Sequence, residues 1–121
     1  MKIEILKQEF SVCKVKNLSQ FDMEEDFYFV GKTDEEISLV CVTQAVPQNI
    51  LACENDWRAF RIQGVLDFSL TGILSKITTL LAEKNIGIFA VSTYNTDYIL
   101  TKSENLEAAI SILKSNGYEI V

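Results

Sequence analysis

The residues best suited to binding a small charged molecule lie in the middle of the chain, where a strand-like pattern gives way to a helix-like pattern. They are Asp67, Ser69, Thr71 and Gly72. A helix that begins near Gly72 leaves its first N–H groups unpaired and concentrates partial positive charge at that end. A carboxylate is a natural ligand for such a terminus, and the lack of a Cβ at Gly72 would let it approach closely. The alternative is that Ser69 or Thr71 simply caps the helix and that Gly72 is a packing glycine. In either case, we expect a β-branched residue at position 72 to crowd the helix start.

A second group of candidates follows in the segment "STYNTDY", residues 92–98. If two strands are joined here, this turn lies at the same end of the sheet as the helix start. Asp97, and also Asp67, could then face an ammonium group. A helix start for a carboxylate and an aspartate for an amine together make an amino-acid site. Alternatively, Asp97 is an ordinary turn residue that hydrogen-bonds its own backbone.

The chain contains no histidine, which argues against an enzyme. Ser-His and Cys-His catalysis and the commonest metal ligand are excluded together. An enzyme would need a carboxylate pair such as Asp67 and Asp97, or an activated cysteine, and no motif supports either. Cys13, Cys41 and Cys53 are widely spaced, and the first two lie in apolar runs, so we expect structural thiols. The sequence therefore predicts no metal and no cofactor.

Composition and charge limit the partners further. The formal net charge is −6 and no cluster of Lys and Arg occurs, so neither nucleic acid nor an anionic membrane is an expected partner. No apolar run approaches the roughly 20 residues of a membrane span, and the first residues lack a signal-peptide pattern. We therefore expect a soluble, cytoplasmic protein with enough apolar residues to build a core.

The second half of the sequence has a regular order of elements. It predicts a strand at 57–66, a helix at 72–85, a nearly all-apolar and therefore central strand at 86–93, a strand at 97–102, a helix at 103–116 and a last strand at 118–121. Ser103 is the expected N-cap of the second helix, and Asn85 and Gly117 are the expected helix ends. The order β-α-β-β-α-β indicates an α+β, ferredoxin-like fold with both helices on one face of an antiparallel sheet.

The first half is less regular and richer in strands. Four short strands are expected at residues 2–8, 10–15, 27–32 and 36–42. Residues 17–26 hold at most one helical turn, and residues 46–56, which contain the only proline, are expected to be a connector. We therefore predict a smaller strand-rich lobe at 1–56 beside a domain at 57–121.

The segment "LDFSLTGILSKITTLLAEKNIGIFAVSTYNTDYIL", residues 66–100, resembles the ACT domain. The resemblance is strongest to small ACT-like proteins related to the amino-acid-binding domains of the CASTOR arginine sensors. It rests on a loop ending in Gly-Ile at a helix start and on the later "STYNTDYIL" strand-turn-strand. It covers residues 57–121, and the first half resembles the degenerate N-terminal ACT-like lobe of the same proteins.

The resemblance implies a regulatory module in which paired ACT units bind a free amino acid where they meet. The matching ligand-binding residues are Asp67, Phe68, Ser69, Leu70, Thr71, Gly72, Ile73, Ser92, Thr93, Tyr94, Asn95, Thr96 and Asp97. The sensors are larger and use more ACT units, so a complete site here is expected to need the first lobe or a second subunit. A homodimer is the expected assembly. The alternative function is an oligomerisation or interaction protein that binds no ligand.

Overall fold

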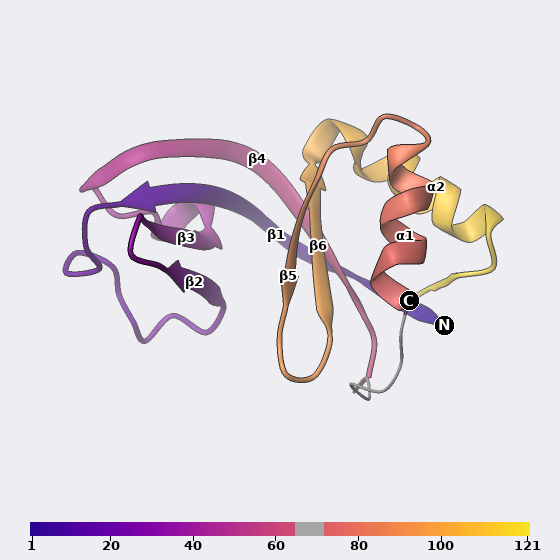
Figure 1. Cartoon of the computed structure of the whole chain (residues 1–121), viewed down its shortest axis with the longest axis horizontal. Coiled ribbons are helices and arrows are strands. Elements are labelled where there is room, and N and C mark those ends of the chain that lie inside the picture. Colours follow the sequence, from indigo (N-terminus) through magenta and orange to yellow (C-terminus); the bar gives the residue numbers. More distant parts are fainter. Residues whose placement is uncertain (65–71) are drawn as a thin grey trace. The chain divides into compact units, whose positions relative to one another are not determined.

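The computed structural model describes residues 1–64 and 72–121. The chain forms two compact units (Figure 1). The helical unit consists of Met1–Lys7 together with Arg58–Val121, and the strand unit consists of Gln8–Trp57. Two long strands, β1 (Lys2–Val15) and β4 (Ile50–Ile62), contribute to both units. Within the described ranges, no helix is long and apolar enough to cross a membrane.

The helical unit has the predicted ferredoxin-like order of elements. After the end of β4 come α1 (Ile73–Ala82), β5 (Ile88–Ser92), β6 (Asp97–Lys102), the 3-10 turn η2 (Ser103–Asn105), α2 (Leu106–Ser115) and β7 (Glu119–Ile120). The strands lie in the order β7, β1, β4, β6, β5. The start of the chain therefore lies between β4 and β7, and Ile3 pairs in parallel with Ile120. The α+β, ferredoxin-like fold class is confirmed.

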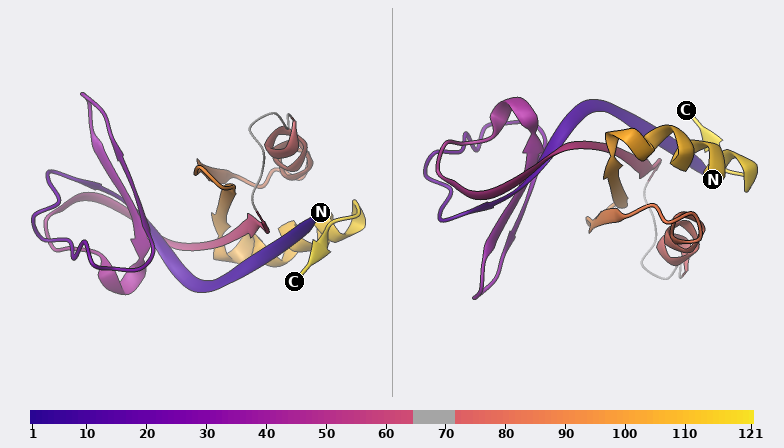
Figure 2. Two further views of the ribbon diagram at one scale, coloured as in Figure 1. Left: turned by 90° about the horizontal axis from the view of Figure 1, so that it is seen from below. Right: turned by 90° about the horizontal axis from the view of Figure 1, so that it is seen from above.

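Both helices cover the same face of the sheet in this unit. Their buried side chains share one cluster with the inward residues of the strands, namely Ile3, Phe60, Ile62, Ile77, Leu81, Ile86, Ile99, Ala109 and Leu113. The two helices also contact each other, and both lie on the same side of the β5–β6 hairpin (Figure 2). The arrangement predicted from the apolar stripes is thus confirmed, because the apolar residues of both helices pack into one common core.

The residues predicted to terminate the two helices are confirmed, whereas the predicted N-cap of the second helix is not. Asn85 after α1 and Gly117 after α2 have positive φ angles of 58° and 91°, as expected for left-handed terminators. The predicted N-cap Ser103 is wrong. It begins the 3-10 turn η2, which moves the start of α2 to Leu106 and makes Asn105 the N-cap residue, with no side-chain cap hydrogen bond. The Ser103 Oγ is buried without a hydrogen-bond partner among the described residues.

Residues 86–93 were expected to form a central strand, and this is wrong. β5 stands at the end of the strand order, with β6 as its partner on one side. Its residues are half-buried or exposed, because the helices cover one face only. On the described part of the chain, β5 is an edge strand.

The strand unit contains the later part of β1, β2 (Tyr28–Lys32), β3 (Ile37–Val42), the 3-10 turn η1 (Thr43–Ala45) and the first part of β4. The order is β2, β3, β1, β4. Its core is formed by buried residues of β1 and β3 with Phe21, namely Cys13, Val15, Phe21, Leu39 and Cys41. Residues 17–26 form turns and bends, within the predicted limit of one helical turn.

Two expectations for the first half are wrong. The strands expected at 2–8 and 10–15 are one continuous strand, β1, which runs through the exposed Glu9 where the apolar pattern is interrupted. The expected connector at 46–56 ends early, because β4 begins at Ile50, shortly after Pro47. The division into an ACT-like lobe at 1–56 and a domain at 57–121 stays a prediction.

Candidate functional site

The predicted site residues fall into two groups in the structure. Those of the strand-to-helix loop, Asp67, Phe68, Ser69, Leu70 and Thr71, lie outside the described residues. Gly72 and Ile73 at the start of α1, and the hairpin turn at 92–97, are described. The geometry of the site is therefore built from these two places.

The start of α1 has the geometry expected of an anion site. Gly72 precedes the helix with φ 79° and ψ −1°, a left-handed conformation that favours glycine. The first helical hydrogen bond runs from the Lys76 N–H to the Gly72 carbonyl, 2.9 Å away. Gly72 has no side chain to cap the helix, and the first turn contains no acidic residue. The first N–H groups and the positive end of the helix dipole are thus not neutralised by the first turn itself.

The expected crowding by a β-branched residue at position 72 stays a prediction. A Cβ built at Gly72 would meet no heavy atom of the described residues within 4 Å. The positive φ angle by itself favours glycine here, since L-residues adopt that backbone conformation only with strain.

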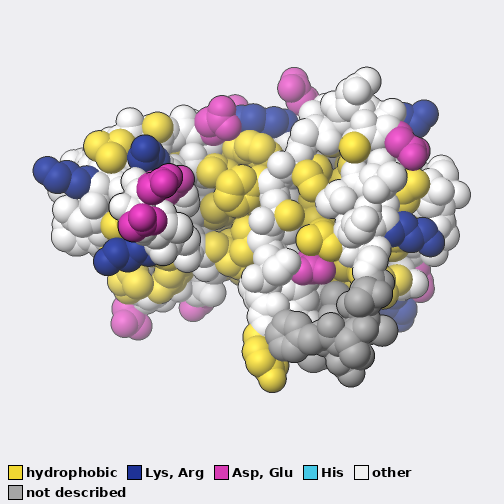
Figure 3. Space-filling model, in the orientation of Figure 1, with side chains coloured by type: hydrophobic (Ala, Val, Ile, Leu, Met, Phe, Trp, Pro, Cys, Tyr) yellow, Lys and Arg dark blue, Asp and Glu magenta, His cyan; other side chains and the backbone are white. Residues whose placement is uncertain are grey.

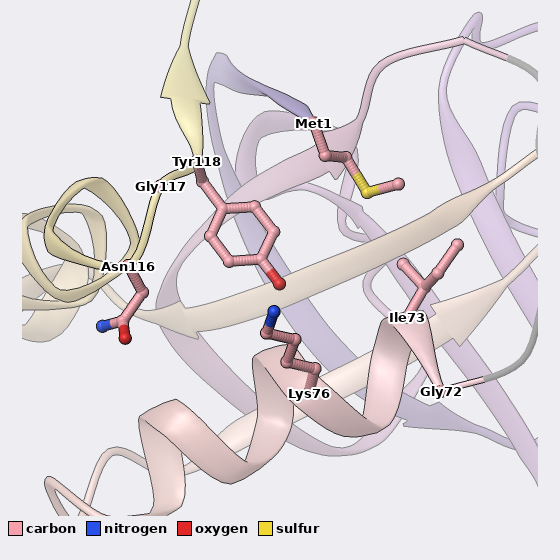
Figure 4. Close-up of a pocket in the computed structure, with 7 residues that line it drawn as sticks. All are labelled: Met1, Gly72, Ile73, Lys76, Asn116, Gly117 and Tyr118. Atoms are coloured by element: carbon pink, nitrogen blue, oxygen red, sulfur yellow. The ribbon is translucent and has the colours of Figure 1, made fainter.

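A pocket of approximately 310 Å³ opens beside this helix start (Figure 4). It is lined by Met1, Gly72, Ile73, Lys76, Asn116, Gly117 and Tyr118. The Lys76 amino group and the Tyr118 hydroxyl point toward each other across it, while Met1 and Ile73 provide apolar side chains (Figure 4). The Asn116 amide is engaged elsewhere, because its Nδ2 donates to the Ile112 carbonyl at 2.8 Å.

The pocket favours an anionic group. Lys76 brings a positive charge one turn from the helix start, and none of the seven lining residues is acidic. Burial raises the pKa of the Tyr118 hydroxyl, so this group stays protonated and can donate a hydrogen bond at neutral pH. A carboxylate at this place would lie beside the start of α1, an ammonium group and a hydroxyl.

Most of these lining residues were missed from the sequence. The sequence assigned no role to Lys76, and Asn116 to Tyr118 were predicted only as a helix end and the start of a strand. The available signal was topological: in a ferredoxin-like fold the second helix ends beside the start of the first. No local motif marks Lys76 or Tyr118.

The hairpin turn after β5 is held by its own side chains. The Ser92 hydroxyl donates to the Asp97 carboxylate at 2.6 Å across a paired position of the two strands. The Thr93 N–H and hydroxyl both donate to the Thr96 carbonyl, at 2.8 Å and 3.0 Å. Tyr94 at the tip is 80% exposed. Asp97 is therefore a cross-strand acceptor and does not fit the alternative of a carboxylate bonded to its own backbone.

One bond ties this turn to the end of β4. The buried Thr96 hydroxyl donates to the Ile62 carbonyl at 2.7 Å. Because β4 leads toward α1, the turn and the start of α1 lie at the same end of the sheet, as Figure 1 shows. The two predicted groups thus share an end of the fold, but no residue of 92–97 lines the pocket beside Gly72.

The distribution of charged side chains indicates neither a nucleic-acid-binding surface nor a metal site. On the face shown in Figure 3, Lys and Arg side chains are scattered among Asp and Glu, and no continuous basic patch is visible there. Within residues 1–64 and 72–121, no cluster of three or more Cys, Asp or Glu has the arrangement of a metal site. The pocket beside Gly72 is therefore the best candidate site.

Comparison with known proteins gives a family and several related folds. A family model described as the ACT domain matches residues 52–115. The crystal structure of protein Atu0741 from Agrobacterium tumefaciens is 29% identical, with a TM-score of 0.87 over 99% of this chain and 91% of that one.

Two more distant structures share the fold. VC0802 from Vibrio cholerae, described as a protein of unknown function and a possible transport protein, is 20% identical with a TM-score of 0.74, covering 93% of this chain and 86% of that one. The ligand-free regulatory subunit of aspartate kinase from Thermus thermophilus is 11% identical with a TM-score of 0.68, covering 95% of this chain and 96% of that one.

Proposed function

Because this chain belongs to the ACT domain family, we propose that it is a regulatory module whose helical unit binds a free amino acid. The observation that carries the proposal is the start of α1 beside Lys76, where the described residues provide no side-chain cap. This arrangement offers fixed hydrogen-bond donors and positive charge to a carboxylate, the group common to all amino acids.

The carboxylate end of the ligand is assigned to the pocket beside Gly72. The backbone N–H groups of the first turn of α1 bind one oxygen, and the Lys76 ammonium group binds the other. The protonated Tyr118 hydroxyl donates a further hydrogen bond from the opposite wall. The apolar side chains of Met1 and Ile73 contact the aliphatic part of the ligand.

The amine end is assigned to the acidic residues at the same end of the sheet. Asp97 is half-buried, and its bond to Ser92 fixes the direction of its carboxylate. Asp67 is the second acid of the proposal and lies outside the described residues. A basic amino acid would use both acids, whereas a neutral one would need only Asp97.

We propose that the functional unit is a homodimer in which a second copy helps to enclose the ligand. In the described residues β5 is an edge strand. An edge strand presents unpaired N–H and C=O groups that another chain can bind. The homodimer also fits the resemblance to ACT domains, in which paired units bind the ligand where they meet.

A function without a ligand is the second candidate. The hydroxyls of Ser92, Thr93 and Thr96 are all used inside the fold, so the turn is stable without a bound molecule. In that case the same edge strand would serve assembly only, and the proposed role remains non-catalytic.

A thermal-shift screen of the common amino acids at millimolar concentration tests the proposal. A ligand present at about 100 times its dissociation constant stabilises the folded state by roughly 2.7 kcal/mol. Lys76→Gln is expected to reduce the shift strongly, while Lys84→Gln, in the exposed turn that follows the same helix, should leave it unchanged. If no amino acid raises the melting temperature, the non-sensing interaction protein replaces the sensor.

A further inference from the structure

The strand unit brings together cysteines that are far apart in the sequence. Cys13 lies in β1 and Cys53 in β4, neighbouring strands of the sheet. The Cys13 Sγ lies 3.2 Å from the Cys53 Sγ. On the same face, two residues along each strand, Ser11 contacts Asn55 at 2.6 Å. Cys13 and Cys53 are thus opposite each other across an antiparallel pair.

This position suits a disulfide. Opposite residues of antiparallel strands have Cα atoms about 4.5–5.5 Å apart, within the range of about 4.4–6.8 Å that disulfides span. The two sulfurs must approach by a little over an ångström to reach the bonded distance of about 2.0 Å. Side-chain rotation is sufficient for that, so the backbone pairing of β1 with β4 can be kept.

The two thiols differ in their access to solvent. Cys13 is 3% exposed, whereas Cys53 is half-buried at the edge of the same cluster. Burial, together with the neighbouring Cys53 thiol, raises the pKa of Cys13 to about 12, so this thiol stays protonated at neutral pH. The Cys53 thiol faces the Asn55 side chain, whose Oδ1 lies 3.4 Å away. A dissolved oxidant therefore meets Cys53 first.

The third cysteine is in a different situation. Cys41 in β3 is fully buried, and burial raises its pKa to about 11. It contributes to the apolar core of the strand unit with Leu39 and Val15. An oxidant in solution does not reach it in the folded protein.

We propose that Cys53 and Cys13 form a redox-active pair in which peroxide oxidises Cys53 and Cys13 then closes a disulfide. The Cys53 thiolate attacks a peroxide oxygen, the O–O bond breaks, and hydroxide leaves, giving a sulfenic acid. The Cys13 sulfur attacks the Cys53 sulfur, the S–O bond breaks, and the leaving hydroxide takes the Cys13 proton. Two thiols lose two electrons and two protons, and one hydrogen peroxide becomes two waters.

The disulfide would constrain the strand unit. It links β1 to β4 and closes the loop that contains β2 and β3. Closing a loop restricts the unfolded chain, so the oxidised protein is expected to melt several degrees above the reduced protein. Oxidation of the pair is thereby coupled to the stability of the strand unit.

Hydrogen peroxide treatment of the reduced full chain, followed by mass spectrometry without reductant, tests the proposal. The monomer should lose two hydrogen atoms in mass, and digestion should give a peptide pair joined through Cys13 and Cys53. Cys41→Ala should give the same product. Cys53→Ser should give neither the loss nor the joined peptides.

A second measurement keeps the proposal testable if a core variant fails to fold. Cys13→Ser should stop the reaction at the sulfenic acid, which dimedone traps on Cys53. The proposal is overturned if the wild-type chain shows no loss of two hydrogens, if the joined peptides contain Cys41, or if oxidation yields only disulfide-linked dimers.

Discussion

Replacing Gly72 tests the left-handed backbone that positions the start of α1. Gly72 has φ 79°, and a Cβ there would meet no atom of the described residues within 4 Å, so we expect the cost of Gly72→Ala to come from backbone strain. A non-glycine residue in this conformation costs about 1–2 kcal/mol. Removing a glycine also stabilises by about 0.4–1 kcal/mol through the unfolded chain.

Gly87→Ala is the matched control, because Gly87 also has open space around it but no left-handed φ. The unfolded-chain contribution is common to both variants and cancels. Gly72→Ala should therefore be about 1–2 kcal/mol less stable than Gly87→Ala, measured by urea unfolding. In a chain of this length the melting temperatures should differ by roughly 3–10 °C. Equal stability of the two variants would refute the argument from backbone strain, and Gly72→Asn should fall between them because asparagine tolerates this conformation.

Three further predictions concern the hairpin, the buried thiols and the assembly. Thr96→Val removes the donor to the Ile62 carbonyl and should cost about 1–3 kcal/mol in urea unfolding, whereas the exposed Thr79→Val should cost much less. Burial raises the pKa of Cys13 to about 12 and of Cys41 to about 11, so the folded state keeps protons that the unfolded state releases above 9.0. Stability should therefore be fully present below pH 9 and fall as the pH rises toward 11–12, and Cys41→Ala should flatten that fall in chemical unfolding at each pH. Sedimentation at micromolar concentration should show a dimer, and a monomer that still binds an amino acid would contradict the proposed assembly.

The helices were predictable because each carries its own local signal. Ile77 and Leu81 in α1, and Ala109 and Leu113 in α2, repeat at helical spacing, and all four are buried. Gly117 marks an end by a conformation that few other residues adopt. The β-α-β-β-α-β order then followed from counting elements.

Features that depend on distant parts of the chain were not predictable in the same way. The pairing of Ile3 with Ile120 joins the two ends of the sequence, and no local pattern indicates it. The first residues of β4 were predicted to be a connector because the segment 46–56 contains the only proline, yet Pro47 lies before the strand, which begins at Ile50.

The candidate site was predictable in part for the same reason. Gly72 was identified from its place before an apolar stripe. Lys76 and Tyr118 line the same pocket only because the end of α2 lies beside the start of α1. No local sequence pattern predicts that proximity. Likewise, Cys13 and Cys53 were expected to be unrelated structural thiols, and their contact depends on the pairing of β1 with β4.

The most direct test of the proposed function is an NMR titration of the ¹⁵N-labelled chain with the amino acid that gives the largest thermal shift. If the carboxylate binds at the start of α1, the amide signals of Ile73, Leu74 and Ser75 should move in a saturable way. The same titration of Lys76→Gln should need a much higher ligand concentration. Saturable shifts confined to other parts of the chain, or no shifts at all, would contradict an amino-acid site at this helix start.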